Sequence, residues 1–348
     1  MAIEKIDPNF KVETEIQKDD IRFYNVLEEP FRVYGVYFED GMFRRLPERV
    51  AETVSEGVLR IHNHTAGGRV RFRTNSPYIA ISVDTPVVGK MPHFAMTGSS
   101  GFDLYEGKRC CGSFVPPFNY SNGYESVLDL GSQEMRDITI HFPLYCRISR
   151  LHIGLSDQAT VESPKPYRCE TPIVYYGSST TQGGCASRPG MAYPNIVSRR
   201  VDVDHINLGF SGNGKGEPEI TDYIKELKMS AFVMDYDHNS PSFEHLQQTH
   251  ERMFRAIRDA NPDLPINCMS RPQYYVTPNV QRRIEIIRTT VENSRARGDE
   301  KVWMLTGQQL MEMTEGEGLV DGCHPTDLGF FSMGKVLSDL LKTILNIS

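Results

Sequence analysis

A carboxylate and an imidazole lie three residues apart in the segment Asp321-Gly322-Cys323-His324-Pro325-Thr326, just before an amphipathic run that is typical of a helix. A histidine is an effective general base when its other ring nitrogen donates to a carboxylate, because that bond fixes the tautomer and stabilises the imidazolium. The pair of Asp321 and His324 therefore predicts proton transfer with a nucleophile from elsewhere in the chain. A helix-capping pair at a surface turn is the alternative interpretation.

A candidate nucleophile lies in the small-residue turn Gly177-Ser178-Ser179-Thr180-Thr181, which follows an apolar strand predicted over Pro172 to Tyr176. A serine on such a turn is exposed, and free backbone N–H groups there can hold an oxyanion. A polar turn that caps a helix would use the same residue types. Two further blocks, Asn207 to Gly214 and Asp235 to Asn239, also follow predicted strands, and glycines in the first let the backbone approach a ligand closely.

The elements that position these blocks alternate along the second half of the chain. Strands are predicted over Ile173 to Tyr176, Val203 to Leu208, Ala231 to Met234, Pro265 to Met269 and Val302 to Leu305. Helices are predicted over Glu217 to Leu227, Phe243 to Ala260, Asn279 to Arg297 and Gly329 to Leu345. This alternation indicates a parallel sheet covered by helices on both faces. Ligands bind beyond the carboxyl ends of strands in that architecture, so Ser179, Gly212 and Asn239 are expected to converge.

The first half of the chain has a different texture, with short alternating runs separated by turn residues. These runs are Val58 to Asn63, Val70 to Arg73, Tyr78 to Val83, Asp137 to Phe142 and Ile148 to Ile153. They predict an antiparallel sheet or sandwich. The segment Asp157 to Tyr167, which contains two prolines, predicts a linker. With 348 residues, 39% of them hydrophobic, the chain can fill two cores. We therefore predict a β-sandwich over residues 1–165 and an α/β domain over residues 171–348.

Taken in order, the four polar blocks resemble the SGNH (GDSL-type) hydrolase family. Gly101-Phe102-Asp103-Leu104-Tyr105 also resembles the Gly-x-Asp-Leu-Tyr signature of an N-terminal domain that accompanies one branch of these esterases. The resemblance implies a flavodoxin-like three-layer α/β/α catalytic domain, preceded by an antiparallel, jelly-roll-like β-sandwich. It also implies an α/β enzyme that hydrolyses ester bonds.

The resemblance assigns a role to each site residue. Ser179 is the nucleophile, Asp321 and His324 are the acid–base pair, and the oxyanion hole consists of the N–H groups of Ser179 and Gly212 with the side-chain amide of Asn239. The family usually has aspartate where this chain has Ser178, which leaves Ser178 as the weaker rival for nucleophile. It usually has Gly-x-Asn-Asp where this chain has Asp235 to Asn239, so the register at Asn239 can differ by a residue or two.

The mechanism that follows is acyl transfer to water through an acyl-serine, with no metal and no organic cofactor. A β-sandwich beside an SGNH domain resembles carbohydrate acetyl esterases, so a small-molecule ester or an acylated carbohydrate is the expected substrate. The alternative is a non-catalytic carbohydrate-binding protein with a degenerate hydrolase site. Ser178 and the altered block at Asp235 to Asn239 motivate that alternative.

Composition limits the classes of partner and the cellular compartment that we expect. The chain has 38 basic and 45 acidic residues without a block of like charge, which predicts neither nucleic acid nor membrane as a partner. Its seven cysteines form no regular framework, which favours reduced thiols in a cytoplasmic setting. The start Met1-Ala2-Ile3-Glu4-Lys5 has no apolar core of signal-peptide length. A secreted or periplasmic location is expected instead if a signal peptide was removed. The oligomeric state is left open.

Four weaker candidates have alternative interpretations. His62 and His64 would share a face on a strand and could bind metal, but a half-buried or solvated strand face is the preferred explanation, since no third ligand is identifiable. His238 with Asp235 and Asp237 could be metal ligands, but an oxyanion-loop role is preferred. Arg188 could present its guanidinium to a substrate or be a solvated loop residue. The aromatic residues of the segment 114–124 could form a sugar platform or simply pack.

Overall fold

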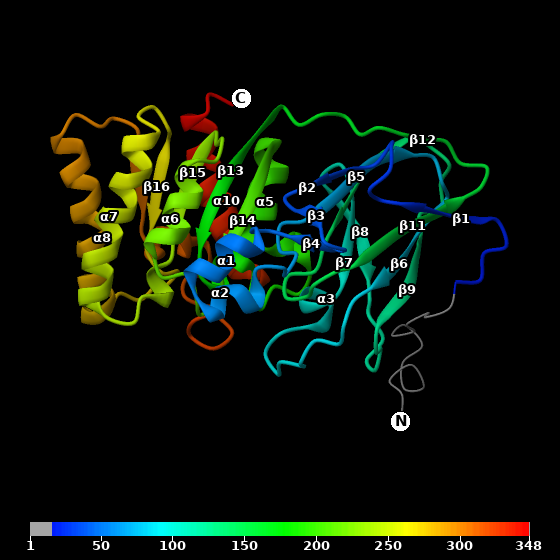
Figure 1. Cartoon of the computed structure of the whole chain (residues 1–348), viewed down its shortest axis with the longest axis horizontal. Helices are drawn as coiled ribbons and strands as arrows, with labels where there is room; N and C mark the ends of the chain where they lie inside the picture. The colour runs from blue at the N-terminus through cyan, green and yellow to red at the C-terminus, as the bar shows by residue number, and fades with distance from the viewer. Residues whose placement is uncertain (1–15, 348) are drawn as a thin grey trace. The chain divides into compact units, whose positions relative to one another are not determined.

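A computed structural model describes residues 16–347, which form two compact units (Figure 1). The first contains the described part of Met1–Arg44 together with Asn63–Lys165 and Ser187–Pro189, and the second contains Arg45–His62, Pro166–Ala186 and the described part of Gly190–Ser348. This grouping differs from the predicted division in two short segments. Residues 45–62 belong to the second unit, and residues 187–189 belong to the first. The signal-peptide prediction for Met1 to Lys5 lies outside the described residues.

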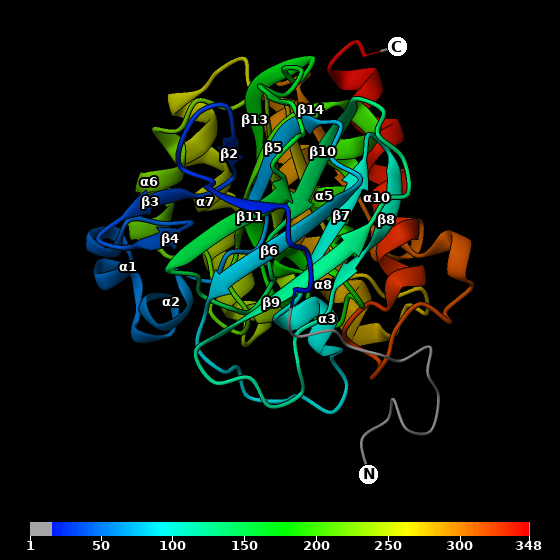
Figure 2. The ribbon, with the colours of Figure 1, turned by 90° about the vertical axis from the view of Figure 1, so that its right-hand side faces the viewer.

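The first unit is built on two antiparallel sheets (Figure 2). Within the described chain, one sheet has the order β1-β11-β6-β9 and the other β12-β5-β10-β7-β8, with β2 also paired to β5. The strands are β1 (Ile21–Asn25), β2 (Arg32–Tyr34), β5 (Arg69–Thr74), β6 (Tyr78–Asp84), β7 (Phe102–Glu106), β8 (Arg109–Phe114), β9 (Gly123–Asp129), β10 (Arg136–His141), β11 (Arg150–Ser156) and β12 (Val161–Glu162). The unit also holds the hairpin β3 (Tyr37–Glu39) and β4 (Met42–Arg44) and the short helix α3 (Met96–Ser99).

Alternate side chains of both sheets supply one apolar core. Ile79 and Ile81 of β6 join Phe72 of β5 and Ile138 and Ile140 of β10, all essentially inaccessible to solvent. In β10 buried and partly exposed side chains alternate, so its period of two reflects burial on one face, whereas residues 78–83 of β6 are buried on both faces. The predicted β-sandwich is confirmed. The predicted linker contains β12, which pairs with the edge of β5 before the prolines begin.

One predicted strand is a helix. Residues Val58 to Asn63 fall mainly in α2 (Glu56–Ile61), which follows α1 (Glu48–Val54), and the Ser55 hydroxyl caps α2 by accepting from the Val58 N–H at 3.2 Å. Val58 and Ile61 are three apart and pack into the core of the second unit, so the helical period prevails over the alternation. The predicted shared strand face of His62 and His64 is therefore wrong, because His62 is the C-cap of α2.

The second unit contains a parallel five-stranded sheet of order β14-β13-β15-β16-β17. Its strands are β13 (Cys169–Gly177), β14 (Val203–Gly209), β15 (Ala231–Asp235), β16 (Ile266–Met269) and β17 (Val302–Leu305). Its other helices are α4 (Ser179–Gln182), α5 (Tyr193–Val201), α6 (Pro218–Lys225), α7 (Phe243–Ala260), α8 (Pro278–Ala296), α9 (Gly307–Leu310) and α10 (Asp327–Ile344). Within the described residues, three single turns are 3-10 helices: η3 (Pro189–Met191), η4 (Asp237–Asn239) and η5 (Glu312–Thr314).

Helices cover both faces of this sheet. Val174 and Tyr176 of β13 pack in one apolar cluster with residues of α6, α7 and α8, which Figure 1 shows beside β15 and β16. Tyr175, which points the other way, meets Tyr193 of α5 at 5.6 Å between ring centroids. A side chain on Gly334 of α10 would collide with Ile196 of α5, so these two helices pack closely on that second face. The three-layer α/β/α architecture is confirmed.

No helix within residues 16–347 is both long and apolar enough to cross a membrane. All seven cysteines lie in this described part, and each carries a free thiol.

Candidate active site

The ends of three neighbouring strands bring the predicted blocks together. Gly177 at the end of β13 pairs with Gly209 of β14 on one side and with Asp235 of β15 on the other. The strand order is the flavodoxin-like order 2-1-3-4-5, in which the switch point lies between the first and third strands. A Cβ at Gly177 would overlap the Asp235 carbonyl, and one at Gly209 would overlap the backbone of Gln182. Glycine is therefore needed where these segments converge.

The two candidate serines have different environments. Ser178 is fully buried and is the N-cap of α4, where its hydroxyl accepts from the Thr180 N–H at 3.2 Å. Ser179 is the first residue of α4 and is 6% exposed. Its Oγ lies 3.0 Å from Nε2 of His324. The structure brings Ser179, and not Ser178, to the imidazole.

Asp321 holds the other side of the same imidazole. Its Oδ2 lies 2.8 Å from His324 Nδ1, and its Oδ1 accepts from the backbone N–H groups of His324 at 2.7 Å and Cys323 at 3.0 Å. Partial burial would raise the pKa of Asp321, but these hydrogen bonds to the ionised form lower it to about 2. The helix α10 begins only at Asp327, with Thr326 as its N-cap, so Asp321 does not cap that helix.

The Gly212 loop lies against α4. Gly212 has φ of +71°, which favours glycine, and the Ser211 N–H donates to Oε1 of Gln182 at 3.0 Å. The backbone N–H groups of Ser179 and Gly212 have no acceptor among residues 16–347. Gln182 was not predicted from the sequence. A glutamine directly after the small-residue turn at 177–181 is the sequence signal that could have identified it.

Asn239 reaches the same loop from β15. It ends η4, and its Nδ2 donates to the Phe210 carbonyl at 2.9 Å. A primary amide has two N–H donors, so one of them stays without an acceptor in the described chain. The Asn239 amide is thus fixed against Phe210, which lies two residues before Gly212 in the neighbouring loop.

A buried ionic network holds η4 in place. Asp237 accepts from the backbone N–H of Arg271 at 2.9 Å and from the guanidinium of Arg283 at 2.9 Å. Burial would raise the pKa of Asp237, but the Arg271 charge and its hydrogen bonds lower it below the usual value. Arg283 lies on the buried stripe of α8 beside Val280 and Ile284, and an arginine on an apolar stripe is the sequence signal that was missed.

The alternative of a metal site at His238, Asp235 and Asp237 is not supported. Both carboxylates already have protein donors, since Asp235 accepts from Thr181 at 2.8 Å and from Tyr193 at 2.9 Å and Asp237 is bound by two arginines. Burial raises the pKa of Asp235 to about 7. Burial also lowers the pKa of His238 to about 3, so its imidazole is neutral near pH 7.

Arg188 is partly exposed, and its guanidinium is held by an ion pair. It belongs to the first unit, where its guanidinium donates to Asp103 Oδ2 at 3.0 Å and to the Tyr105 hydroxyl. Asp103 is completely buried and its second oxygen lies 2.8 Å from Nδ1 of His141. The aspartate and tyrosine of the Gly-x-Asp-Leu-Tyr segment therefore bind an arginine, which compensates the buried charge.

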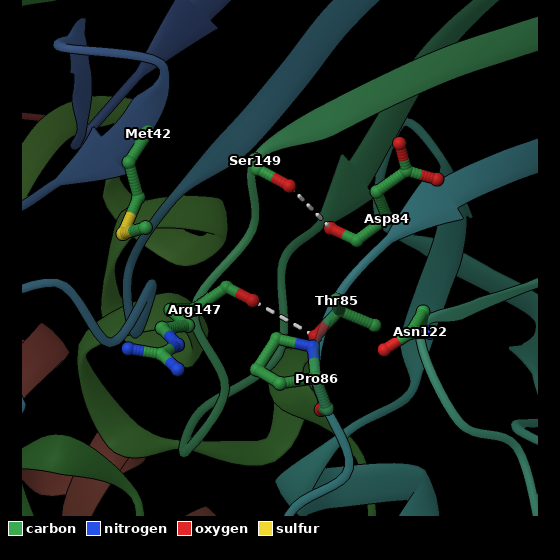
Figure 3. Close-up of a pocket in the computed structure, with 7 residues that line it drawn as sticks. All are labelled: Met42, Asp84, Thr85, Pro86, Asn122, Arg147 and Ser149. Carbon is green, nitrogen blue, oxygen red and sulfur yellow. Dashed lines mark hydrogen bonds between the residues drawn. The ribbon is translucent and has the colours of Figure 1, made fainter.

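The aromatic residues of the segment 114–124 mostly pack. Phe114, Tyr120 and Tyr124 are buried, whereas Phe118 is 68% exposed and lies under the Lys90 ammonium at 3.1 Å. A hollow of about 590 Å³ lies nearby in the sandwich (Figure 3). In it Thr85 Oγ1 donates to the Arg147 carbonyl at 2.8 Å and Ser149 Oγ to the Asp84 carbonyl at 3.4 Å. Both hydroxyls are therefore used in hydrogen bonds that hold neighbouring segments of the sandwich together.

Two family models match the chain. Residues 170–342 match the family described as GDSL-like lipase/acylhydrolase, and residues 21–161 match the GxDLY family, described as the N-terminus of SGNH-type esterases. The chain is 30% identical to a GDSL-like lipase from Bacteroides ovatus, with a TM-score of 0.84 over 94% of this chain and 99% of that one. The chain belongs to the GDSL-like lipase/acylhydrolase family. It is accordingly an ester-hydrolysing enzyme.

Other solved structures share the fold of this GDSL-like hydrolase at lower identity. A salicylyl-acyltransferase from a tetracycline biosynthetic pathway is 18% identical, with a TM-score of 0.78 over 95% of this chain and 100% of that one. An acetyl xylan esterase from Butyrivibrio proteoclasticus is 10% identical, with a TM-score of 0.60 over 93% and 99%. No curated protein matches the chain.

Proposed function

We propose that this hydrolase is a serine esterase that removes small acyl groups, acetyl first among them, from carbohydrates. The observation that carries the proposal is the continuous chain of hydrogen bonds from Ser179 Oγ to His324 Nε2 at 3.0 Å and from His324 Nδ1 to Asp321 at 2.8 Å. A hydroxyl, an imidazole and a carboxylate in that order form the acyl-transfer triad.

Each residue then has a defined task. Neutral His324 accepts the Ser179 proton as Oγ attacks the ester carbonyl, and ionised Asp321 stabilises the imidazolium that forms. The N–H groups of Ser179 and Gly212 and the free amide hydrogen of Asn239 stabilise the tetrahedral oxyanion. The alcohol leaves with the proton from His324. A water molecule then repeats the sequence on the acyl-serine and releases the acid.

Replacing Asn239 by alanine is expected to lower kcat about 100-fold with little change in KM, because a single oxyanion donor acts mainly in the transition state. The assay is hydrolysis of p-nitrophenyl acetate. Asn293→Ala is the control, since Asn293 lies on α8 and its amide bonds Glu251 at 2.8 Å. A change in KM alone would indicate ground-state binding and a different register for the block.

The carbohydrate part of the proposal is supported by an exposed aromatic side chain beside the Asp321 loop. Tyr275 is 71% exposed, and its hydroxyl donates to the Glu315 carbonyl at 3.3 Å. The neighbouring Gln273 donates to the carbonyl of Gly322, next to Asp321, at 3.2 Å. An aromatic face held at that position can stack on the apolar face of a sugar ring. Structures with the same fold include family two carbohydrate esterases and an acetyl xylan esterase.

Replacing Tyr275 by alanine is therefore expected to raise KM for acetylated xylo-oligosaccharides several-fold and to leave KM for p-nitrophenyl acetate unchanged. Acetate release measures the first and p-nitrophenolate absorbance the second. Tyr275→Phe, which keeps the ring, should behave like the wild type. An equal rise in KM for both substrates would instead indicate that Tyr275 supports the Asp321 loop. Absence of acetate release from every acetylated sugar, with p-nitrophenyl acetate still hydrolysed, would refute the carbohydrate assignment.

The non-catalytic alternative makes the opposite prediction. A carbohydrate-binding protein with a degenerate site would bind sugars but would hydrolyse p-nitrophenyl acetate no faster than its Ser179→Ala variant.

A further inference from the structure

Two cysteines that the proposed mechanism does not use flank His324. Cys323 precedes it in the chain, and the Cys323 sulfur, a carboxylate oxygen of Asp321 and a ring nitrogen of His324 all lie within 4.8 Å of one another. Separately from that group, the sulfur of Cys185 lies within 4.8 Å of a ring nitrogen of His324. Cys185 belongs to the loop after α4, three residues beyond Gln182, and both thiols are partly accessible.

We propose that Cys185, Cys323, His324 and Asp321 form a binding site for a soft divalent metal ion, with Zn²⁺ as the preferred occupant, and that its occupation inhibits the esterase. Two thiolates, an imidazole and a carboxylate are a ligand set that zinc takes readily. Ligand atoms around tetrahedral zinc lie about 3.3 to 3.8 Å apart, given bond lengths of about 2.0 to 2.3 Å. Cys185 lies within 4.8 Å of His324 but outside the group that Asp321 and Cys323 form with His324, so binding by all four ligands requires the Cys185 and Cys323 side chains to rotate toward the imidazole.

Inhibition follows from the hydrogen bonds of the imidazole. His324 uses Nε2 for Ser179 and Nδ1 for Asp321, so a metal that binds either nitrogen breaks one of these bonds. Binding at Nε2 removes the base from the nucleophile. Binding at Nδ1 removes the carboxylate that orients the ring. The inhibitory part of this inference rests on the proposed function, whereas metal binding itself does not.

The thiols are otherwise unreactive. Burial raises the pKa of Cys185 to about 12, and burial together with the Asp321 charge raises the pKa of Cys323 above its usual value. Neither thiol is therefore activated as a nucleophile that would compete with Ser179. Metal binding releases the thiol protons to solvent as the two thiolate–metal bonds form.

Direct binding is tested with Co²⁺, which reports thiolate ligands through a charge-transfer band in the near ultraviolet. The wild type is expected to show this band at one equivalent of Co²⁺, and Zn²⁺ is expected to displace the cobalt. Cys185→Ser and Cys323→Ser should each reduce the band by about half. Cys169→Ser, a partly exposed cysteine at the start of β13, should leave it unchanged. Absence of the band in the wild type would overturn the site, whether or not the protein is an esterase.

Inhibition is tested by titrating free Zn²⁺ against hydrolysis of p-nitrophenyl acetate. Micromolar Zn²⁺ is expected to inhibit, a chelator to restore activity, and Mg²⁺ at the same concentration to have no effect, because it prefers oxygen ligands. Cys185→Ser should keep the basal rate and raise the inhibitory Zn²⁺ concentration at least tenfold. Equal inhibition of the wild type and Cys185→Ser would refute the thiol site. A protein that hydrolyses no ester but keeps the cobalt band would refute the proposed function and leave the metal site standing.

Discussion

Replacing Ser179 by alanine is expected to abolish covalent labelling by a fluorophosphonate and to lower kcat for p-nitrophenyl acetate by about 10⁴-fold or more, since loss of a triad nucleophile leaves only the residual catalysis of the oxyanion hole. The physical reason is that Ser179 Oγ is the hydroxyl within hydrogen-bonding distance of His324 Nε2, at 3.0 Å. Labelling is read by intact-protein mass spectrometry, and activity by p-nitrophenolate release.

The neighbouring serine is the matched control. Ser178→Ala removes the hydroxyl that accepts from the Thr180 N–H and caps α4, so we expect a loss of about 1 kcal/mol in stability with labelling retained. Retention of full labelling by Ser179→Ala and its loss in Ser178→Ala would exchange the two assignments. Thermal unfolding of both variants separates loss of the nucleophile from loss of the fold.

Replacing Asp321 by asparagine is expected to lower kcat by about 10⁴-fold, because an amide at this position favours the wrong imidazole tautomer and cannot stabilise the imidazolium. The pKa of Asp321 is about 2, so its carboxylate stays ionised throughout the neutral and mildly acidic range. A fall in wild-type activity between pH 7 and pH 4 therefore does not come from protonation of Asp321. The rate is measured with p-nitrophenyl acetate from pH 4 to pH 8.

Asp222→Asn is the control for a lost carboxylate, because Asp222 forms an exposed ion pair with Lys225 at 2.7 Å on α6 and should leave activity unchanged. Full activity of Asp321→Asn across the pH range would show that the carboxylate is structural and that Ser179 and His324 act as a dyad.

The regular elements of the second unit were largely predictable because their apolar residues follow a single period. The bounds predicted for α7 and β17 coincide with those observed, and α8 and α10 differ by one or two residues. The helix α5 was missed. It is short, has proline at its second position, and is buried on most of its surface, so it shows no contrast between two faces. The region of α1 and α2 was misjudged because an apolar residue at every second or third position fits both periods.

The candidate site was likewise predictable from the sequence only in part. Its residue types and their order along the chain, Ser179, Gly212, Asn239, Asp321 and His324, are properties of the sequence, and so is the expectation that they follow strands. The residues that hold these side chains in place could not be predicted from the sequence. Arg283 is one of many arginines in the sequence, and only packing shows that it neutralises Asp237 beneath Asn239. From the sequence Arg188 could be a substrate contact or a solvated loop residue, and only packing shows that it binds Asp103.

The sequence by itself determined the elements, the two kinds of sheet and the chemistry available, because periodicity and residue type are local properties. Only the tertiary structure decided the strand order that sets β13 between β14 and β15, since strand pairing joins residues far apart in the chain. That order places Gly177 between Gly209 and Asp235. It also decided which serine faces His324: Ser178 and Ser179 are chemically identical, but a helix that begins at Ser179 turns one hydroxyl inward as its cap and the other toward the imidazole.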